Sequence, residues 1–399
     1  MKRYWILVVL IPFVVLTISI YYATASEIDK PDYYLKTLGG REEEVSHVTV
    51  RGQYTSEPIA IRPSGSEYPN EKDSFWERLD STYFYQDELQ ELFQEYRSFL
   101  RGKKNPNALY VDEKLIAYAQ YDFRFKTDEV QSDMIDISVM EKAKKSSLSF
   151  QVKLPKEKNE YISVMDVYVK DQSMKLLVNQ YQKSGKYSQP GDFKYVFYTV
   201  DLDKKSIEGK QLIATGVSQD QTSQTTTALI SSNDVMKPNR YLLFDRSSYA
   251  LDGKKDILNR ELLYYDIWNG QMTAVQNELV RDLLMNGKPG ELRIDYLGDD
   301  LYFTPMNIYD QSRIVHYNLT EKKLKSDVKI NLKDWMQDEL HVQMKQFTDN
   351  RLYMNYYGRK SPGVAVVDLD TGRIIYQGEI ARKDGLELSN LMINSLSVK

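Results

Sequence analysis

The chain has 399 residues, and its 53 Lys and Arg nearly balance its 57 Asp and Glu, so the formal net charge is −4 at pH 7. A charge this small and mixed argues against nucleic acid as a partner. Cysteine is absent and only three histidines are present. Disulfides, thiol nucleophiles and zinc–thiolate sites are therefore excluded, and we expect no metal ion or other cofactor. This composition favours a binding or regulatory protein over an enzyme.

The N-terminal segment has the pattern of a membrane or export signal. Lys2 and Arg3 precede an uncharged run over residues 4–22, nineteen residues long, which as a helix would measure about 28 Å. The positive-inside rule then sends the rest of the chain across the membrane. We predict a signal anchor or signal peptide over residues 1–25 and a juxtamembrane linker over residues 26–45. The protein is then either a single-pass cell membrane protein with its C-terminal domain outside the cytoplasm or, if cleaved after Ala25, secreted.

Two sequence markers recur with one phase along the rest of the chain. In the first, a polar turn leads into a Leu- or Tyr-rich strand, with steps of 61, 65, 60 and 51 residues between Leu115, Leu176, Tyr241, Leu301 and Leu352. In the second, a strand ends in a tight polar turn, with steps of 63, 65, 52 and 50 residues between Ser138, Asp201, Asp266, Asn318 and Asp368. Two markers that keep one phase indicate true repetition.

Each repeat reads as four short strands joined by turns rich in Gly, Asp and Asn. The repeats span about 107–154, 161–213, 224–279, 290–332 and 341–380. Four-stranded units of this length predict an all-β fold, a β-propeller. A β-sandwich is the rival fold, but it would not produce a phased repeat at this period.

The two ends of the repeat region suggest how the ring closes. Val48–Arg51, Ile59–Arg62 and Leu391–Val398 read as strands outside the five repeats. Joining them in one composite blade would remove exposed sheet edges. We therefore predict about six blades in an ectodomain over residues 46–399, with a five-bladed ring or a seven-bladed one as the alternatives.

One amphipathic helix is predicted over residues 86–101. Leu89, Leu92, Phe93 and Tyr96 fall at helical spacing, and Gly102 ends the pattern. We expect this apolar face to pack on the ring. A second, partly helical segment is expected between Met272 and Asn286.

Catalytic motifs are absent from the sequence. It has no Gly-x-Ser-x-Gly elbow, no His-Glu-x-x-His pair and no phosphate-binding glycine loop. The segment Asp368–Gly372 resembles the start of a calcium loop, but it lacks a third acidic ligand, so we expect a hairpin turn there. His316 and His341 are expected to be packed or hydrogen-bonded rather than catalytic.

Long insertions recur after the second strand of the repeats. They cover about Phe123–Asp133, Gln182–Asp192, Asp245–Arg260 and Pro305–Ser312. In a propeller this junction always lies on one face of the disc, where repeat proteins commonly bind their ligands. The candidate ligand-binding residues on this face are Arg124, Tyr187, Arg246, Tyr249, Tyr309 and Arg359.

The phased blades and the N-terminal segment together resemble the poorly characterised, membrane-tethered extracytoplasmic propeller proteins of Gram-positive bacteria. This resemblance implies an accessory or sensory protein and transfers no functional residue. We expect a non-catalytic binding or regulatory platform that engages a membrane or envelope protein; the sequence identifies no small-molecule ligand. The alternative is a carbohydrate-active hydrolase or lyase that uses carboxylates at the channel mouth.

Overall fold

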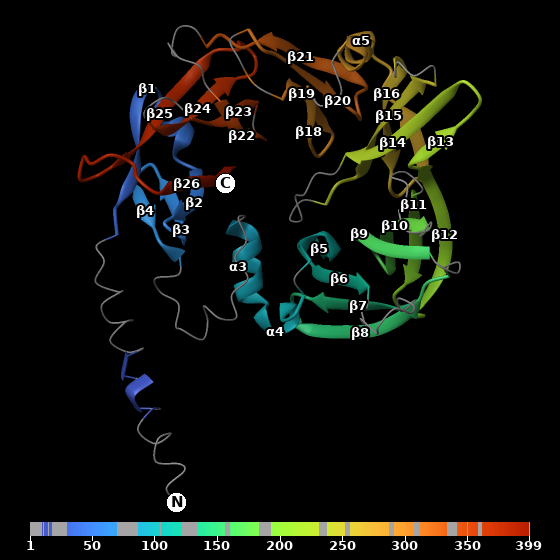
Figure 1. Cartoon of the computed structure of the whole chain (residues 1–399). Helices are drawn as coiled ribbons and strands as arrows, with labels where there is room; N and C mark the ends of the chain where they lie inside the picture. The colour runs from blue at the N-terminus through green and yellow to red at the C-terminus, as the bar shows by residue number, and fades with distance from the viewer. Residues whose placement is uncertain are drawn as a thin grey trace, which may run out of the picture.

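The fold is a ring of six antiparallel sheets, each of four or five strands (Figure 1). This computed structural model describes residues 10, 12–14, 16–17, 30–69, 87–103, 105–121, 134–155, 160–182, 193–230, 238–251, 256–286, 291–306, 308, 311–332, 341–348, 350–357 and 361–398. The arrangement is that of a six-bladed propeller and confirms the predicted all-β class. Among these residues no helix is long and apolar enough to cross a membrane. The predicted anchor at residues 1–25 lies almost entirely outside the described residues.

We number the blades I to VI, and we give their strands from the inner to the outer edge. Blade I contains β26 (Leu391–Val398), β2 (Val48–Tyr54), β3 (Glu57–Arg62) and β4 (Gly65–Glu67). Blade II contains β5 (Leu109–Val111), β6 (Leu115–Tyr121), β7 (Met134–Glu141) and β8 (Ser146–Lys153). Blade III contains β9 (Glu160–Lys170), β10 (Ser173–Gln182), β11 (Phe193–Asp201) and β12 (Ser206–Thr215).

The other three blades follow the same order, with an extra strand in two of them. Blade IV contains β14 (Ser223–Ile230), β15 (Tyr241–Ala250), β16 (Ile257–Asp266) and β17 (Gln271–Ala274), and the short β13 (Val217–Gln219) pairs with one end of β14. Blade V contains β18 (Leu292–Leu297), β19 (Asp300–Pro305), β20 (Arg313–Asn318) and β21 (Lys323–Lys329). Blade VI contains β22 (His341–Thr348), β23 (Arg351–Tyr357), β24 (Pro362–Asp368), β25 (Ile374–Arg382) and β1 (Tyr33–Gly40).

The composite blade forms as predicted, because β26 from the C-terminus pairs with β2 from the N-terminal part of the chain. The pairing runs from Val48 opposite Val398 to Tyr54 opposite Leu391. Residues far apart in the sequence thus share one sheet, and blade I carries both ends of the ring. This pairing supports a ring of six blades rather than five or seven.

The assignment of residues 26–45 to a linker is wrong for its second half. Tyr33–Gly40 form β1, which pairs with β25 as the outermost strand of blade VI. The Tyr33 and Leu35 side chains are buried in the core between blades VI and I. Tyr33 and Leu35 are two residues apart, so on a strand both side chains face the same side, which here is the core; their burial explains why this segment is a strand. A short 3₁₀ helix, η1 (Glu42–Val45), follows and leads into blade I.

A shared turn explains the second sequence marker. At the end of the third strand of blades III to VI, an Asp or Asn side chain accepts hydrogen bonds from main-chain N–H groups in the turn; Asp201, Asp266, Asn318 and Asp368 occupy this position. The next residue is a buried aliphatic side chain that packs against the preceding blade; these residues are Leu202, Ile267, Leu319 and Leu369. We call this residue the plug. A residue with positive φ then closes the turn: Lys205, Gly270, Lys322 or Gly372.

Blade II departs from this pattern. Its third strand ends at Glu141, opposite Leu115, so Glu141 rather than Ser138 is the counterpart of Asp201. The plug position is therefore occupied by Lys142, whose ammonium group lies 5.9 Å from the centre of the Tyr96 ring. Tyr96 belongs to the helical segment before blade II, so the lysine contacts a helix and not a neighbouring blade.

Helices occupy the joint between blades I and II. The predicted helix is divided at Tyr96 into α3 (Asp87–Glu95) and α4 (Arg97–Leu100). The Leu89, Leu92, Phe99 and Leu100 side chains are buried against blade II, as predicted for the apolar face. Each of the other five joints has an apolar core shared by two blades, whereas no such core of described residues joins blade I to blade II. Figure 1 shows α3 between these two blades.

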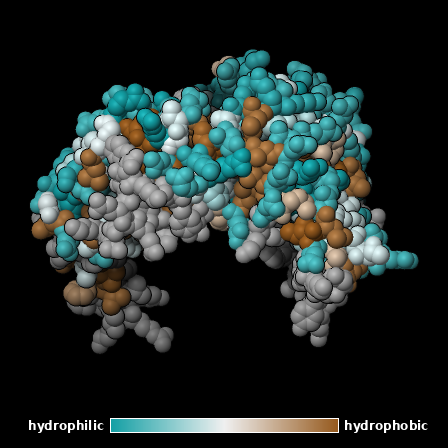
Figure 2. Space-filling model, turned by 90° about the horizontal axis from the view of Figure 1, so that it is seen from above, coloured by the Kyte–Doolittle hydropathy of each residue, from teal (hydrophilic) through white to brown (hydrophobic). Residues whose placement is uncertain are grey.

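The two faces of the ring are set by strand direction. Because neighbouring strands are antiparallel, the turns between the third and fourth strands lie on one face, which we call the hairpin face. The connections between the second and third strands, where the insertions were predicted, lie on the opposite face, which we call the insertion face. Hydrophilic residues cover most of the rim that Figure 2 shows, with smaller hydrophobic patches between them.

Candidate binding site

Only two of the six predicted binding residues lie in the described part of the chain. Arg124, Tyr187, Tyr309 and Arg359 lie outside the described residues, so their placement stays a prediction. Arg246 and Tyr249 both lie on β15. The predicted insertion over Asp245–Arg260 is mostly strand, because β15 continues to Ala250 and β16 begins at Ile257. The sequence missed these strands because Asp, Arg, Ser and Asn are common in them and lower β propensity.

Arg246 and Tyr249 do not form one site, because they are three residues apart on a strand and therefore face opposite sides of the sheet. The Arg246 guanidinium lies 2.5 Å from the Glu261 carboxylate. The Asn259 amide also donates to Glu261, at 2.8 Å. These residues lie on the side of blade IV that faces blade III, since the neighbouring Phe244 and Leu263 belong to the core between those blades.

A cleft of about 490 Å³ lies on the other flank of blade IV, between β16 and helix α5 (Glu278–Asn286). Its walls are residues 259–262 of β16, residues 274–278, and Arg281 and Leu284 of the helix. The residues of β16 that line the cleft are consecutive. Side chains alternate between the two faces of a strand, so a consecutive run means that the main-chain edge of β16 borders the cleft.

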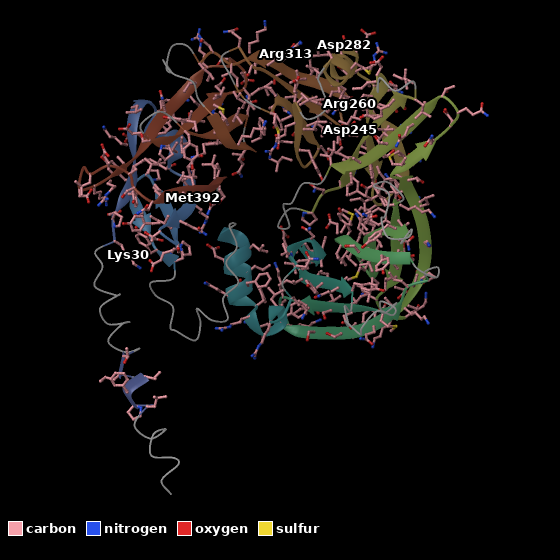
Figure 3. The ribbon with its side chains drawn as sticks, in the orientation of Figure 1. Lys30, Asp245, Arg260, Asp282, Arg313 and Met392 are labelled. Atoms are coloured by element: carbon pink, nitrogen blue, oxygen red, sulfur yellow. The ribbon has the colours of Figure 1, made fainter. Side chains whose placement is uncertain are left out.

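A buried ion pair fixes one wall of the cleft. The Arg260 side chain is only 6 % exposed, and its Nη2 lies 2.7 Å from Oδ2 of Asp245. Its Nε also donates to the same carboxylate, at 3.1 Å to Oδ1. Its Nη1 donates to the carbonyl oxygen of Leu284, at 3.3 Å. Arg260 thus ties the last turn of α5 to the sheet, where a cation also interacts favourably with the helix dipole. Figure 3 labels Asp245 and Arg260 below the helix that carries Asp282.

Helix α5 is held on one side and open on the other. The Asn277 side chain accepts from the Val280 main chain at 3.2 Å, an N-terminal cap. Val280 and Leu284 are buried in the core between blades IV and V. Glu278 and Arg281 are exposed and line the cleft, and neither forms an ion pair with another described residue. Among the described residues, the helix wall of the site thus presents one cation and one anion that form no ion pair.

The strand edge beside the cleft has no partner strand in the described part of the chain. β17 pairs with β16 only from Leu263 to Asp266. One further hydrogen bond, from the Val275 N–H to the Leu262 carbonyl at 2.9 Å, ends this ladder. Main-chain groups alternate in direction along an antiparallel strand, so Arg260, two residues before Leu262, directs its N–H and C=O into the cleft.

A second polar feature of the ring is a half-buried carboxyl, Asp166, on the inner strand β9 of blade III. Asp166 accepts a hydrogen bond of 2.5 Å from the Tyr168 hydroxyl and one of 2.8 Å from the Val167 N–H. Burial raises the pKa of Asp166 to about 6, and these hydrogen bonds only partly oppose that effect. Burial also raises the pKa of Tyr168 well above its ordinary value.

A buried lysine lies between blades V and VI. The Lys345 ammonium group contacts the Thr304 hydroxyl and lies 3.6 Å from Oδ2 of Asp295, and Arg293 donates to Oδ1 of the same carboxylate at 2.7 Å. Burial lowers the pKa of Lys345 to about 8. The Asp295 carboxylate is thus held by two cations, while Asp166 on blade III is held by a tyrosine.

His316 is packed and hydrogen-bonded, as expected. Its Nε2 lies 2.8 Å from Asp300, and its ring stacks on Tyr302 at 4.5 Å between ring centres. Asp368 caps a hairpin turn, as expected, and its Oδ1 accepts from the Thr371 N–H and hydroxyl at 2.9 Å. Among the described residues no cluster of three or more His, Asp or Glu side chains could hold a metal ion.

Sequence reasoning missed the cleft as a whole. The cleft combines Arg260 of β16 with Glu278 and Arg281 of α5. Strand β17 lies between these two elements in the chain, so no local sequence pattern connects them. The one available signal was the second helix near Met272–Asn286, which is confirmed as α5.

Comparisons with known proteins agree with the fold and give no family. No protein-family model matches the chain, and no curated protein matches it. It is similar to the β-propeller domain of the trilobed protease from Pyrococcus furiosus, with 11 % identity, a TM-score of 0.31, and coverage of 67 % of this chain and 65 % of that one. It is also similar to an uncharacterized protein from Listeria monocytogenes, with 11 % identity, a TM-score of 0.33, and coverage of 69 % and 65 %.

A third similar structure is the Synechocystis apocarotenoid oxygenase, with 8 % identity, a TM-score of 0.40, and coverage of 93 % of this chain and 97 % of that one. The chain spans somewhat less than two thirds of the Pyrococcus and Listeria chains. Because every one of these TM-scores is low, the propeller assignment rests on the six sheets themselves. The chain resembles β-propeller domains, and no sequence family is shown for it.

Proposed function

We propose that this protein is a non-catalytic binding platform, held at the outer face of the cell membrane by its N-terminal segment, and that its insertion face engages a membrane or envelope protein. The observation that carries the proposal is the shape of blade IV. Its second and third strands are ten residues each, and beside their insertion-face ends lies the cleft of about 490 Å³. This volume falls within the range of about 300–1,000 Å³ that is common for ligand sites.

The chemistry of the cleft also supports binding rather than turnover. Its buried ion pair is fully engaged, since Arg260 is satisfied by Asp245 and by the end of α5. The free charges, Glu278 and Arg281, stand on a rigid helix at the rim. The contacts of Arg260 with Asp245 and with the end of α5 form the walls of the cleft before a ligand binds, which lowers the entropic cost of association.

The test is crosslinking in intact source cells followed by purification of the tagged full-length protein. We expect a membrane or envelope protein to co-purify at near-stoichiometric yield. Tyr249→Ala, on the insertion-face half of β15, should reduce this yield severalfold. Thr371→Ala, in a turn on the hairpin face, is the matched control and should not change it.

Two results would count against the proposal. One is repeated recovery of the protein alone. The other is equal loss of the partner with the Tyr249 and Thr371 variants, since that would place binding elsewhere or reflect general unfolding. The melting temperature of each variant separates these last two explanations.

A further inference from the structure

Half of the outer edge of β16, beside the cleft, has no paired strand among the described residues. In the described part of the chain, β16 pairs along its whole length with β15 on one side, but with β17 only from Leu263 onward. The half from Ile257 to Glu261 therefore has one open side, and Arg260 directs its N–H and C=O groups to that side. Unpaired main-chain groups of this kind favour pairing with another extended chain.

The far wall of the cleft makes this edge different from an ordinary outer strand. Helix α5 stands opposite the edge and is anchored by Val280 and Leu284 in the core and by Arg260 at its last turn. An added strand would thus lie in a groove with a sheet edge on one side and a helix on the other. The helix therefore limits the length of a strand that can enter the groove and the size of its side chains.

The free cation on the helix selects the occupant's charge. Arg281 lines the cleft, and its guanidinium has no ion-pair partner among the described residues. A guanidinium binds a carboxylate with two parallel hydrogen bonds, which are stronger than neutral ones. Glu278, one turn earlier on α5, lines the same cleft. A second carboxylate placed there would be repelled, so one acidic side chain near Arg281 is preferred over an acidic run.

We propose that this groove binds an extended peptide segment of a partner protein, which adds to β16 as an extra strand and places one Asp or Glu side chain against Arg281. This inference rests on the proposed function and names the chemistry of the partner. Main-chain hydrogen bonds to Arg260 supply register-dependent affinity, and the acidic side chain supplies selectivity.

The experiment is selection of phage-displayed random heptapeptides on the purified full-length protein in detergent, followed by affinity measurement with the synthesised peptides. We expect enriched peptides that share one acidic residue and bind the wild-type protein. Arg281→Glu should weaken them at least tenfold. Asp282→Asn, on the same helix but outside the cleft lining, should leave their affinity unchanged. Both residues are exposed, so melting temperatures should match that of the wild type.

Methylation of the peptide main chain tests the strand geometry itself. Single N-methyl groups placed along a selected peptide should abolish binding at every second position, because only alternate N–H groups face β16. No enrichment, binding that ignores Arg281→Glu, or equal tolerance of N-methylation at all positions would overturn the inference. Suppose that no peptide binds, but that co-purification of a partner from cells is still reduced by Tyr249→Ala. The inference of a peptide groove is then wrong, while the proposed binding platform stands. Failure of both experiments removes the proposed function as well.

Discussion

At the scale of single residues, two buried cations of this ring are held by specific neighbours. Arg260 is satisfied by a carboxylate and a helix carbonyl, and Lys345 by a hydroxyl and Asp295. Asp166 differs, because its neighbours only partly offset its burial and its pKa stays raised at about 6. A buried group that costs stability in its charged form makes the fold sensitive to pH.

Asp166→Asn should therefore change how stability depends on pH. Between about pH 4 and pH 6 the carboxyl is ionised in the unfolded chain but still protonated in the folded one, because folding raises its pKa from 3.8 to about 6. The folded state binds more protons in this window, so stability falls as pH rises through it, by up to about 1.4 kcal/mol per pH unit. Asparagine does not titrate and can still accept from Tyr168.

The measurement is urea unfolding of the wild type and the variant at half-unit steps from pH 4 to pH 8. The wild-type stability minus that of the variant should decrease with pH up to about 6 and then level off. A difference that stays constant across this range would show that Asp166 does not titrate with a raised pKa.

At the scale of elements, the turn after the third strand of blades III to VI packs against the preceding blade. Its capping side chain fixes the turn, and the plug residue fills the gap toward the preceding blade. Blade II has Lys142 in that place because a helix, and not a blade, lies beside it. In blades III to VI, whose joints with the preceding blade are apolar, this position is aliphatic, whereas in blade II it is a lysine.

Leu369→Ala should cost about 2–5 kcal/mol of stability, because it leaves a cavity between blades V and VI where the side chain is fully buried. Lys142→Ala, at the corresponding position of blade II, is the matched control. It removes an interaction with Tyr96 worth about 1 kcal/mol or less. Chemical denaturation of both variants provides the comparison. Equal losses would show that the two turns are equivalent and that the account of the blade I–II joint is wrong.

The elements also show what could be predicted from the sequence. The four strands of blade V follow from turn residues and repeat phase, which are local signals. The pairing of β26 with β2 was predicted from the need to cover the sheet edges at the two ends of the ring. Strand β1 was missed because its short alternation lies next to the predicted membrane segment. The long strands β15 and β16 were taken for a loop because their polar residues lower β propensity; cross-strand ion pairs such as Arg246 with Glu261 compensate for this.

At the scale of the whole molecule, the ring is asymmetric. Among the described residues, five joints have an apolar core and the sixth contains α3 and α4, while blade IV carries the cleft beside α5. The cleft could not be predicted, because it depends on how β16 and α5 pack and not on any motif. The asymmetry gives the insertion face one distinctive region, and the proposed partner should contact that region.

The most direct test places a photo-crosslinking amino acid at single positions of the full-length protein in intact cells. Glu278 reports on the cleft and Thr371 on the hairpin face, and both positions are exposed. We expect a crosslink to one membrane or envelope protein from position 278 and none from position 371. A crosslink from position 371 alone, or equal crosslinks from both positions, would contradict the claim that the insertion face beside blade IV is the binding surface.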